Sequence, residues 1–342
     1  MEKKVKWVHK KYKHSKNEKS IATIQEIEKC FNNIQKLKKE VSKAVIGQER
    51  IIESLLRGLI ANGHVLLEGV PGIAKTLLIR SLSVASGCNV KRVQFTVDML
   101  PTDITGITSY TPGKGFKIEK GPVFTNFLIA DEINRSPPKT QSALLEVMQE
   151  KQVTIGRSRF SLELPFFVMA TENPLETSGV YPLPEAQVDR FLFKVKMGYP
   201  EENEELKVME SNITLQKFED FHLKSVISPK DILKMQEVAK KIYMSDSVKK
   251  YILKIVNKTR DKNFKFAEYI SYGVSPRATI GLFIASKSRA LMHKRNFVLP
   301  EDVKEVAYEV LRHRLILSYK ANIQKIDSDD VIKEILNGIR VL

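Results

Sequence analysis

The sequence has few cysteines and no long apolar run, and each shortage excludes a class of protein. Cys30 and Cys88 are too few for a disulfide framework or a four-cysteine zinc site, so the chain fits a reducing compartment. No segment approaches the ~18 consecutive apolar residues of a membrane-spanning helix. The basic N-terminus also lacks the apolar core of a secretory signal. We therefore expect a cytoplasmic protein with no membrane span.

Positive charge dominates, with a net charge of +16, but it is unevenly distributed. Residues 1–20 carry eight lysines against two acids, whereas residues 51–200 are almost neutral. A solvated tail is the plainer interpretation of residues 1–20, and a nonspecific arm for nucleic acid or an anionic membrane is the alternative. Because no recognition helix or zinc finger is apparent and the central region is near neutral, nucleic acid is not the expected partner.

Short apolar strands alternate with helical segments in the first 200 residues. Strands are predicted at His64–Glu68, Arg92–Thr96, Asn126–Asp131, Phe166–Thr171 and Phe191–Lys196. This alternation predicts an α/β fold with a parallel sheet. From Ser228 onward only helices are predicted. We expect a basic tail at 1–20, an α/β core at 21–200, and a linker with an all-helical domain at 201–342.

A phosphate-binding loop is predicted between the first strand and the helix that follows it. The residues are Gly69, Val70, Pro71, Gly72, Ile73, Ala74, Lys75 and Thr76, followed by Leu77. This is nearly the G-x-x-x-x-G-K-[ST] pattern, with Ala74 in place of the second glycine. Backbone N–H groups and the helix N-terminus would bind phosphate, Lys75 would reach its terminal groups, and Thr76 would ligate Mg²⁺.

Two acids end a later apolar strand, and Asn173 ends another. Carboxylates at the C-terminal edge of a parallel sheet lie where such sheets bind ligands. Asp131 would hold Mg²⁺, and Glu132 would act as general base toward water. Asn173 can both donate and accept, so it would orient that water. Alone, the acids are also consistent with helix capping, and Asn173-Pro174 with an ordinary turn.

Two arginines are candidates for stabilising charge on a phosphate. Arg190 precedes the last strand of the core, and Arg277 follows Ser275-Pro276 at the start of a helix in the second domain. A salt bridge is the alternative role for Arg190, and an ordinary surface position is the alternative for Arg277.

These motifs together resemble the MoxR-type AAA+ ATPases. The resemblance rests on the phosphate loop with its alanine, Ala130–Glu146, Tyr181–Phe191 and Gly273–Arg277, and it spans about residues 40–315. Glu172 stands where glutamine is expected before Asn173. The resemblance implies a helical lid after the core, assembly into hexameric rings, and inserted elements near Pro101–Phe124 and Val153–Leu164 that face the pore or a client.

The same resemblance implies roles for individual residues. Val45, Ile46 and Gly47 match the segment that lines the adenine pocket. Asn173 matches sensor 1, Arg190 the arginine finger that reaches a neighbouring subunit, and Arg277 sensor 2. Whether Arg277 acts on its own nucleotide or on a neighbour's stays open at this stage.

The leading hypothesis is a Mg²⁺-dependent ATPase that remodels or matures a client protein, as the resemblance implies. Such ATPases often act with partners that carry a von Willebrand factor A domain. The first alternative is a nucleic-acid motor or loader, motivated by Arg157, Arg159 and the Lys-rich tail. The second is a scaffold that binds ATP but scarcely hydrolyses it. The intact pair of Asp131 and Glu132 argues against the scaffold.

Overall fold

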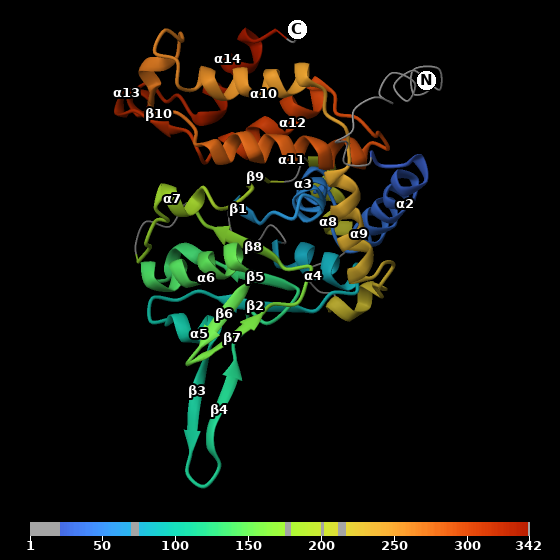
Figure 1. Cartoon of the computed structure of the whole chain (residues 1–342), viewed down its shortest axis with the longest axis vertical. Coiled ribbons are helices and arrows are strands. Elements are labelled where there is room, and N and C mark those ends of the chain that lie inside the picture. The colour runs from blue at the N-terminus through green and yellow to red at the C-terminus, as the bar shows by residue number, and fades with distance from the viewer. Residues whose placement is uncertain (1–20, 70–74, 175–178, 200–201, 211–216, 341–342) are drawn as a thin grey trace, which may run out of the picture.

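An α/β body lies beneath a layer of helices, and a long hairpin projects from the far side of the body (Figure 1). The computed structural model describes residues 21–69, 75–174, 179–199, 202–210 and 217–340. The predicted basic tail lies outside these residues. Within the described ranges, no helix is both long and apolar enough to cross a membrane.

A five-stranded parallel sheet forms the centre of the body. Its spatial order is β2-β5-β8-β1-β9, and every neighbouring pair is parallel. The strands are β1 (Val65–Gly69), β2 (Val90–Gln94), β5 (Phe127–Asp131), β8 (Phe167–Glu172) and β9 (Phe193–Met197). The predicted parallel-sheet α/β fold with a helical C-terminal region is therefore confirmed.

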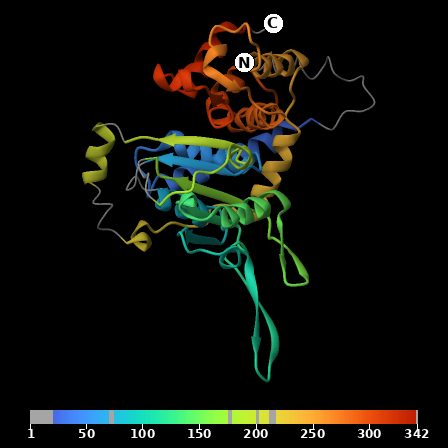
Figure 2. The same cartoon turned by 90° about the vertical axis from the view of Figure 1, so that its left-hand side faces the viewer.

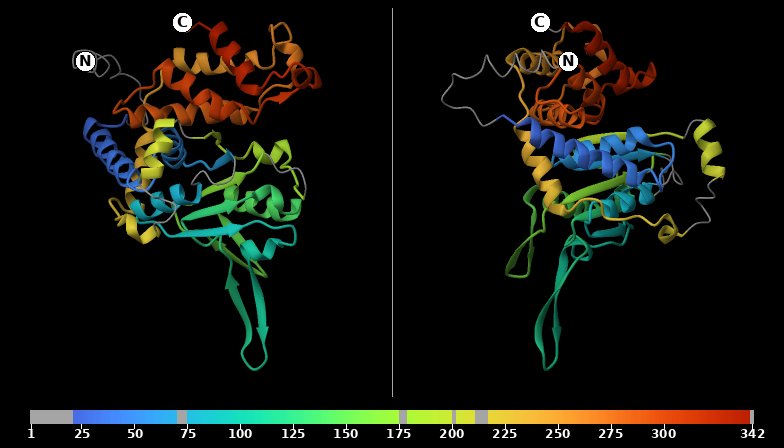
Figure 3. Two further views of the ribbon diagram at one scale, coloured as in Figure 1. Left: turned by 180° about the vertical axis from the view of Figure 1, so that it is seen from behind. Right: turned by 90° about the vertical axis from the view of Figure 1, so that its right-hand side faces the viewer.

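Alternate side chains of the strands enter two separate apolar clusters, one on each face of the sheet. Leu67 and Ile129 belong to one cluster, and Leu66 and Leu128 belong to the other. The first face is covered by α2 (Ile24–Val41), α3 (Glu49–Ile60) and α4 (Lys75–Ala85), and the second by α6 (Pro138–Glu150). Figure 3 shows the sheet between these helices. The result is a three-layer body in which both faces of the sheet are buried.

The spacing of its apolar residues and its N-cap explain why α2 is helical. Ile27, Ile34 and Leu37 recur at helical spacing and are buried. Thr23 caps the helix: its hydroxyl accepts from the Glu26 backbone, while the Glu26 carboxylate accepts from the Thr23 backbone at 3.0 Å. The helix therefore packs on the sheet with a satisfied N-terminus.

Two antiparallel hairpins extend from the body on the side away from the helical layer (Figure 2). The longer is β3 (Gly106–Thr111) with β4 (Gly115–Lys120), preceded by α5 (Pro101–Thr105). The shorter is β6 (Gln152–Ile155) with β7 (Ser158–Ser161). This hairpin lies where an inserted element was expected, near Val153–Leu164, and its second strand begins at Ser158. A tight turn at Gly156, whose φ is +59°, shortens the loop.

The helical layer contains one feature that the sequence did not predict. Its longer helices are α10 (Asp246–Lys258), α11 (Pro276–Met292), α12 (Pro300–Leu311) and α14 (Ser328–Gly338), with the short α13 (Tyr319–Ile323). The prediction of no strands after Ser228 is wrong, because β10 (Ile270–Tyr272) and β11 (Ile316–Leu317) pair antiparallel. Strands of two or three residues are too short to show a period of two.

The elements between the sheet and the helical layer do not form a simple linker. Helix α8 (Glu202–Glu210) and helix α9 (Pro229–Lys240) follow the last strand of the sheet, with a 3₁₀ turn at Phe218–Phe221 between them. Elsewhere in the chain, α7 (Glu185–Val188) precedes β9, and further 3₁₀ turns lie at Ile133–Arg135 and Ala267–Tyr269. Helix α9 packs against α2 and α3, and Gln236 Nε2 donates to the Leu59 carbonyl at 2.8 Å. Helix α9 therefore lies with the body although it follows residue 200, and the predicted boundary at that residue stays a prediction.

Candidate functional site

The two ends of the predicted phosphate loop meet at the C-terminal edge of the sheet. Residues 70–74 lie outside the described residues, but Gly69 ends β1 and Lys75 begins α4. The Lys75 ammonium donates a hydrogen bond to the Gly69 carbonyl. Burial lowers the pKa of Lys75, and the carboxylates of Asp131 and Glu132 oppose that shift. A partly buried cation therefore stands at the loop, close to the two predicted acids.

Asp131 is held from both neighbouring strands. Its Oδ2 accepts from Arg92 Nε at 2.9 Å and from Arg92 Nη2 at 2.6 Å, and its Oδ1 accepts from Thr171 Oγ1 at 2.7 Å. The carboxylate is buried, so these charge-assisted bonds fix its orientation. Neither Arg92 nor Thr171 was singled out from the sequence, since their role depends on the pairing of β2 and β8 with β5.

Glu132 leaves the strand in a left-handed backbone conformation with a φ of 55°. Its backbone N–H donates to Thr171 Oγ1 at 2.8 Å. Its Oε2 accepts from Gln94 Nε2 at 2.7 Å and pairs with Arg135 Nε at 2.9 Å. A non-glycine residue in this conformation is uncommon and is typical of constrained functional turns. The turn separates Glu132 from Asp131 and gives the two acids different partners.

Asn173 and its neighbours complete this edge of the sheet. Asn173 directly follows β8 and is buried. Glu172 is in register with Glu68 of β1, and Lys194 pairs with both carboxylates, at 3.5 Å from Glu172 and 2.5 Å from Glu68. Burial raises the pKa of Glu172, and the Lys194 ammonium opposes the rise. Sequence reasoning missed Lys194, which reaches both acids because β1 pairs with β8 on one side and with β9 on the other.

The predicted adenine segment lies between α2 and α3. Val45 is buried, while Ile46 and Gly47 are partly exposed. Gly47 has a φ of +72°, and a Cβ placed there would lie 2.7 Å from the Cβ of Glu204 in α8. Only glycine combines this backbone conformation with so close a neighbour.

Arg190 and Arg277 lie at the other end of the sheet. Both line a cavity of about 410 Å³, and the lining also includes Asn62, His64, Gln149, Asp189 and Arg314. His64 directly precedes β1, whereas the phosphate loop directly follows it. The Arg190 guanidinium donates to Gln149 Oε1, and Arg277 Nη1 lies 3.4 Å from Asp189 Oδ2. The structure therefore brings the two arginines together and keeps both away from Lys75, Asp131 and Glu132.

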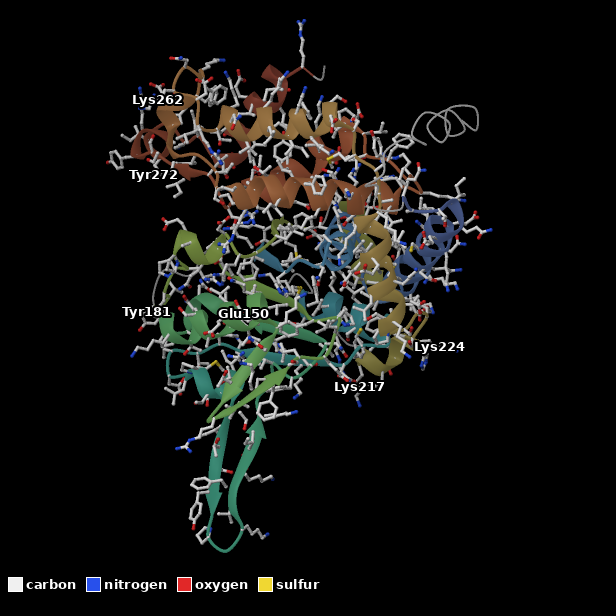
Figure 4. The ribbon with its side chains drawn as sticks, in the orientation of Figure 1. Glu150, Tyr181, Lys217, Lys224, Lys262 and Tyr272 are labelled. Atoms are coloured by element: carbon white, nitrogen blue, oxygen red, sulfur yellow. The ribbon has the colours of Figure 1, made fainter. Side chains whose placement is uncertain are left out.

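The segment that leads into α7 and Arg190 is fixed to α6. Gln141 Nε2 donates to the Tyr181 carbonyl at 2.9 Å, and the Tyr181 N–H donates to the Asn134 carbonyl at 2.6 Å. Figure 4 shows Tyr181 on the α6 side of the body, across from Lys224 below α9. The approach to Arg190 is thus tied to the turn that follows Glu132.

Known proteins match both parts of the chain. The family described as "ATPase family associated with various cellular activities (AAA)" matches residues 64–193, and the AAA lid domain matches residues 265–335. Chaperone MoxR1 of Mycobacterium tuberculosis is 44% identical over 306 residues, which cover 88% of this chain and 80% of that protein. The uncharacterized protein YeaC of Bacillus subtilis is 43% identical over 302 residues, covering 88% and 92%.

A solved structure agrees with these matches. It is a crystal structure described only as an ATPase candidate from Cytophaga hutchinsonii, with 44% identity and a TM-score of 0.86, covering 93% of this chain and 97% of that one. The matched part spans nearly the whole of both chains. The chain belongs to the MoxR family of AAA+ ATPases and is an ATP-hydrolysing enzyme.

Proposed function

We propose that each ATP is hydrolysed between two copies of this chain, so that the site is complete only in an assembly. The separation of Arg190 and Arg277 from the phosphate loop carries this proposal. A parallel strand advances ~3.3 Å per residue, so β1 alone separates the two ends by ~17 Å over its five residues. Because an arginine side chain is shorter than that distance, we assign both arginines to a neighbouring copy's nucleotide.

Within one copy, we assign the binding of ATP to two segments. Residues Gly69 to Leu77 would hold the triphosphate through backbone N–H groups and the Lys75 ammonium. Residues Val45 to Gly47 would line the base. The partly buried, cationic setting of Lys75 supports the first assignment, and the close contact at Gly47 supports the second. These residues bind and orient the substrate, and α8 closes over the base segment.

We assign water activation to Glu132 and Asn173. Glu132 would accept a proton from the attacking water, and Asn173 would hold that water by donating and accepting hydrogen bonds. The constrained turn at Glu132 and the burial of Asn173 beside it support these roles. Arg190 of the neighbouring copy would stabilise the negative charge that develops on the phosphate.

A magnesium ion fits the residues at this edge. Hydroxyl and carboxylate oxygens are the ligands that Mg²⁺ prefers, and Thr76 and Asp131 supply one of each. Thr171 orients the Asp131 carboxylate through a hydrogen bond of 2.7 Å. When bound, Mg²⁺ supplies charge neutralisation to the phosphates. Arg92 also contacts Asp131, so we expect its guanidinium to move aside or share the carboxylate when the metal binds.

Turnover measured against protein concentration tests the shared site. An arginine finger is worth ~10³–10⁵ in rate, so a dilute subunit should be slow and turnover per subunit should rise as copies assemble. Light scattering measured in parallel would report assembly. Constant turnover per subunit across a range in which scattering shows assembly would contradict the proposal. Arg190→Ala should stay slow at every concentration.

We further propose that the assembly is a hexameric ring in the cytoplasm that remodels or matures a client protein. The long hairpin supports a client contact, because Tyr110 and Phe116 are 63% and 80% exposed and their ring centroids are 5.2 Å apart. The buried, free thiols of Cys30 and Cys88 are consistent with a reducing compartment. A partner with a von Willebrand factor A domain is part of the same proposal. Proteins retained by Glu132→Gln in ATP but released in ADP would identify the client.

A nucleic-acid motor is the alternative, and one observation favours it. Arg157 and Arg159 are both exposed on the β6–β7 hairpin. Adding single- or double-stranded DNA distinguishes a nucleic-acid motor from an ATPase that acts on a protein client. Salt-sensitive binding with stimulated turnover would favour the motor, and an unchanged turnover would favour the protein client.

A further inference from the structure

We propose that Arg314 is a positioning residue that holds the backbone around Arg190 and so aims Arg190 at the neighbouring copy's ATP. The proposal rests on the proposed function, since it presumes that Arg190 acts between copies. Arg314 itself touches neither substrate nor metal in this arrangement. Its effect on catalysis would pass entirely through the segment 189–192.

The Arg314 side chain is buried and donates almost entirely to that segment. Its Nε donates to Asp189 Oδ1 at 2.8 Å. Its Nη2 donates to the carbonyls of Asp189 at 3.0 Å and Phe191 at 2.6 Å, and its Nη1 donates to the Leu192 carbonyl at 3.1 Å. A further bond to the Val310 carbonyl ties the same guanidinium to α12. One side chain from the helical layer thus encloses the residues on both sides of Arg190.

Only arginine can make this set of bonds. Its planar guanidinium presents five donors in fixed directions, whereas lysine offers a point charge on a flexible stem. Burial lowers the pKa of Arg314 to about 10, and the Asp189 carboxylate opposes the shift, so the side chain stays charged at neutral pH. A neutral replacement would leave Asp189 and several carbonyls without these donors, which is costly in a buried place.

Neighbouring residues extend the same attachment along β9, which is an edge strand of the sheet. His313 Nε2 pairs with the Phe191 carbonyl at 3.1 Å, and Arg312 Nη1 donates to the Lys194 carbonyl at 3.2 Å. Ser275 Oγ donates to Asp189 Oδ2 at 3.0 Å from the start of α11. Residues of the helical layer therefore cover the free edge.

Arg190 is less constrained than the segment that carries it. Its side chain is exposed and its guanidinium contacts Gln149 on α6. The exposed side chain would reach outward by leaving Gln149, while its backbone stays fixed. A misplacement of ~1 Å can cost ~10²-fold in rate, so a finger needs such a support. The position of the helical layer in one copy would then set the activity of the neighbouring copy's site.

Mixed assemblies of two variants test this inference. Arg314→Met subunits keep an intact phosphate loop and Glu132 but would present a misplaced Arg190. Glu132→Gln subunits cannot hydrolyse ATP but would present a correct Arg190. Alone, Arg314→Met should bind ATP with wild-type affinity and turn over ~10- to 100-fold more slowly, as a fall in kcat with KM unchanged. Mixed with excess Glu132→Gln subunits before assembly, it should recover turnover to the level that Arg190→Ala recovers in the same mixture.

Matched variants separate the outcomes. Arg295→Met removes a comparable arginine of the helical layer, which bonds to Asp302 and the Phe297 carbonyl rather than to 189–192, and should keep turnover within a few-fold of the wild type. If Arg190→Ala is rescued but Arg314→Met is not, or if Arg314→Met is fully active alone, the positioning role is wrong while the shared site stands. If Arg190→Ala is not rescued either, the shared site fails and this inference fails with it. If thermal melting shows that Arg314→Met is not folded, Arg314→Lys replaces it in the same test, with a smaller expected loss of turnover.

Discussion

At the scale of single residues, one hydroxyl connects the two acids of the site. Thr171 Oγ1 donates to Asp131 and accepts from the Glu132 backbone, at 2.7 and 2.8 Å. The same oxygen therefore orients the proposed metal ligand and fixes the turn that carries the proposed base. The two acids could be predicted from the sequence, because they end an apolar strand. Thr171 could not, because its contacts depend on the register between β5 and β8.

Glu132→Gln should lower ATP turnover by ~10²–10⁴-fold while ATP binding is retained. Glutamine keeps the size of the side chain and can still bond to Gln94, but it cannot accept a proton from water. Steady-state turnover and calorimetric titration with ATP measure the two effects. Glu146→Gln on the exposed face of α6 is the matched control and should behave as wild type. Wild-type turnover in Glu132→Gln would remove Glu132 from the mechanism.

His64 should make the folded protein sensitive to acid. Its ring is buried, with the Val168 N–H donating to Nδ1 at 3.0 Å and Nε2 bonded to the Met148 carbonyl at 3.1 Å. Burial lowers the pKa of His64 to about 4, from 6.5 in the unfolded chain. As the pH falls below 6.5, the unfolded chain binds a proton that the folded chain excludes. The free energy of unfolding should therefore fall, by about 2 kcal/mol from this residue between pH 7.5 and 5.

Urea unfolding at a series of pH values measures that effect against His64→Gln. Glutamine can accept from Val168 and donate to Met148, but it does not titrate. The variant should lose less stability than the wild type between pH 7.5 and 5. Parallel pH profiles for the two proteins would show that His64 is not responsible for the acid sensitivity.

At the scale of elements, the long hairpin is separable from the sheet. Its root is fixed where the Gly121 N–H donates to the Thr105 carbonyl at 3.3 Å, and a Cβ at Gly121 would lie only 2.2 Å from the Ile104 carbonyl oxygen. Beyond this root, β3 and β4 bond mainly to each other. The strands can therefore be shortened without disturbing the nucleotide site.

Replacing residues 108–118 with a short turn should leave basal ATPase activity within a few-fold of wild type. It should also abolish retention of the proteins that Glu132→Gln holds in ATP, when the deletion is made in that background. Tyr110→Ser with Phe116→Ser should give most of the same loss, and Lys114→Ser, at the same tip, should give little. Undiminished retention in the deletion would place the client contact elsewhere.

The sequence predicted elements that carry strong local signals and missed those that depend on tertiary contact. The strand and loop from His64 to Thr76 were predicted because apolar run, glycines and Lys-Thr all lie within a few residues. β10 and β11 were missed because two- and three-residue strands leave no pattern. The packing of α9 on the body was missed because an amphipathic helix shows which face is buried but not what covers it.

The same distinction applies to the site. Arg190 and Arg277 were predicted as charge-stabilising residues, but their common place at one cavity required the fold. Arg314 left no local signal, since a single arginine after a helix resembles many surface residues. Its proposed role follows only from its bonds to a segment some 125 residues earlier in the chain.

At the scale of the whole molecule, the two ends of one sheet would carry complementary halves of the proposed shared site. One end presents Lys75, Asp131 and Glu132, and the other presents Arg190 and Arg277. A contact that joins unlike ends of identical copies repeats around an axis and closes into a ring when the rotation allows it. This arrangement favours the proposed ring over a two-fold dimer, in which like surfaces would meet.

Arg277 gives the clearest test of this arrangement, because action within one copy and action between copies predict opposite results. If Arg277 serves a neighbouring copy, Arg277→Ala should bind ATP like the wild type in dilute, unassembled protein, where Lys75→Ala should bind far more weakly. On assembly, turnover per subunit should rise for the wild type. For assembled Arg277→Ala it should stay at least ~10-fold below the wild-type value, because one charge-assisted contact to phosphate is lost. Calorimetry below the assembly concentration and turnover above it measure the two halves. Weakened ATP binding by dilute Arg277→Ala would mean that the helical layer folds back over its own nucleotide, which the ~17 Å length of β1 argues against.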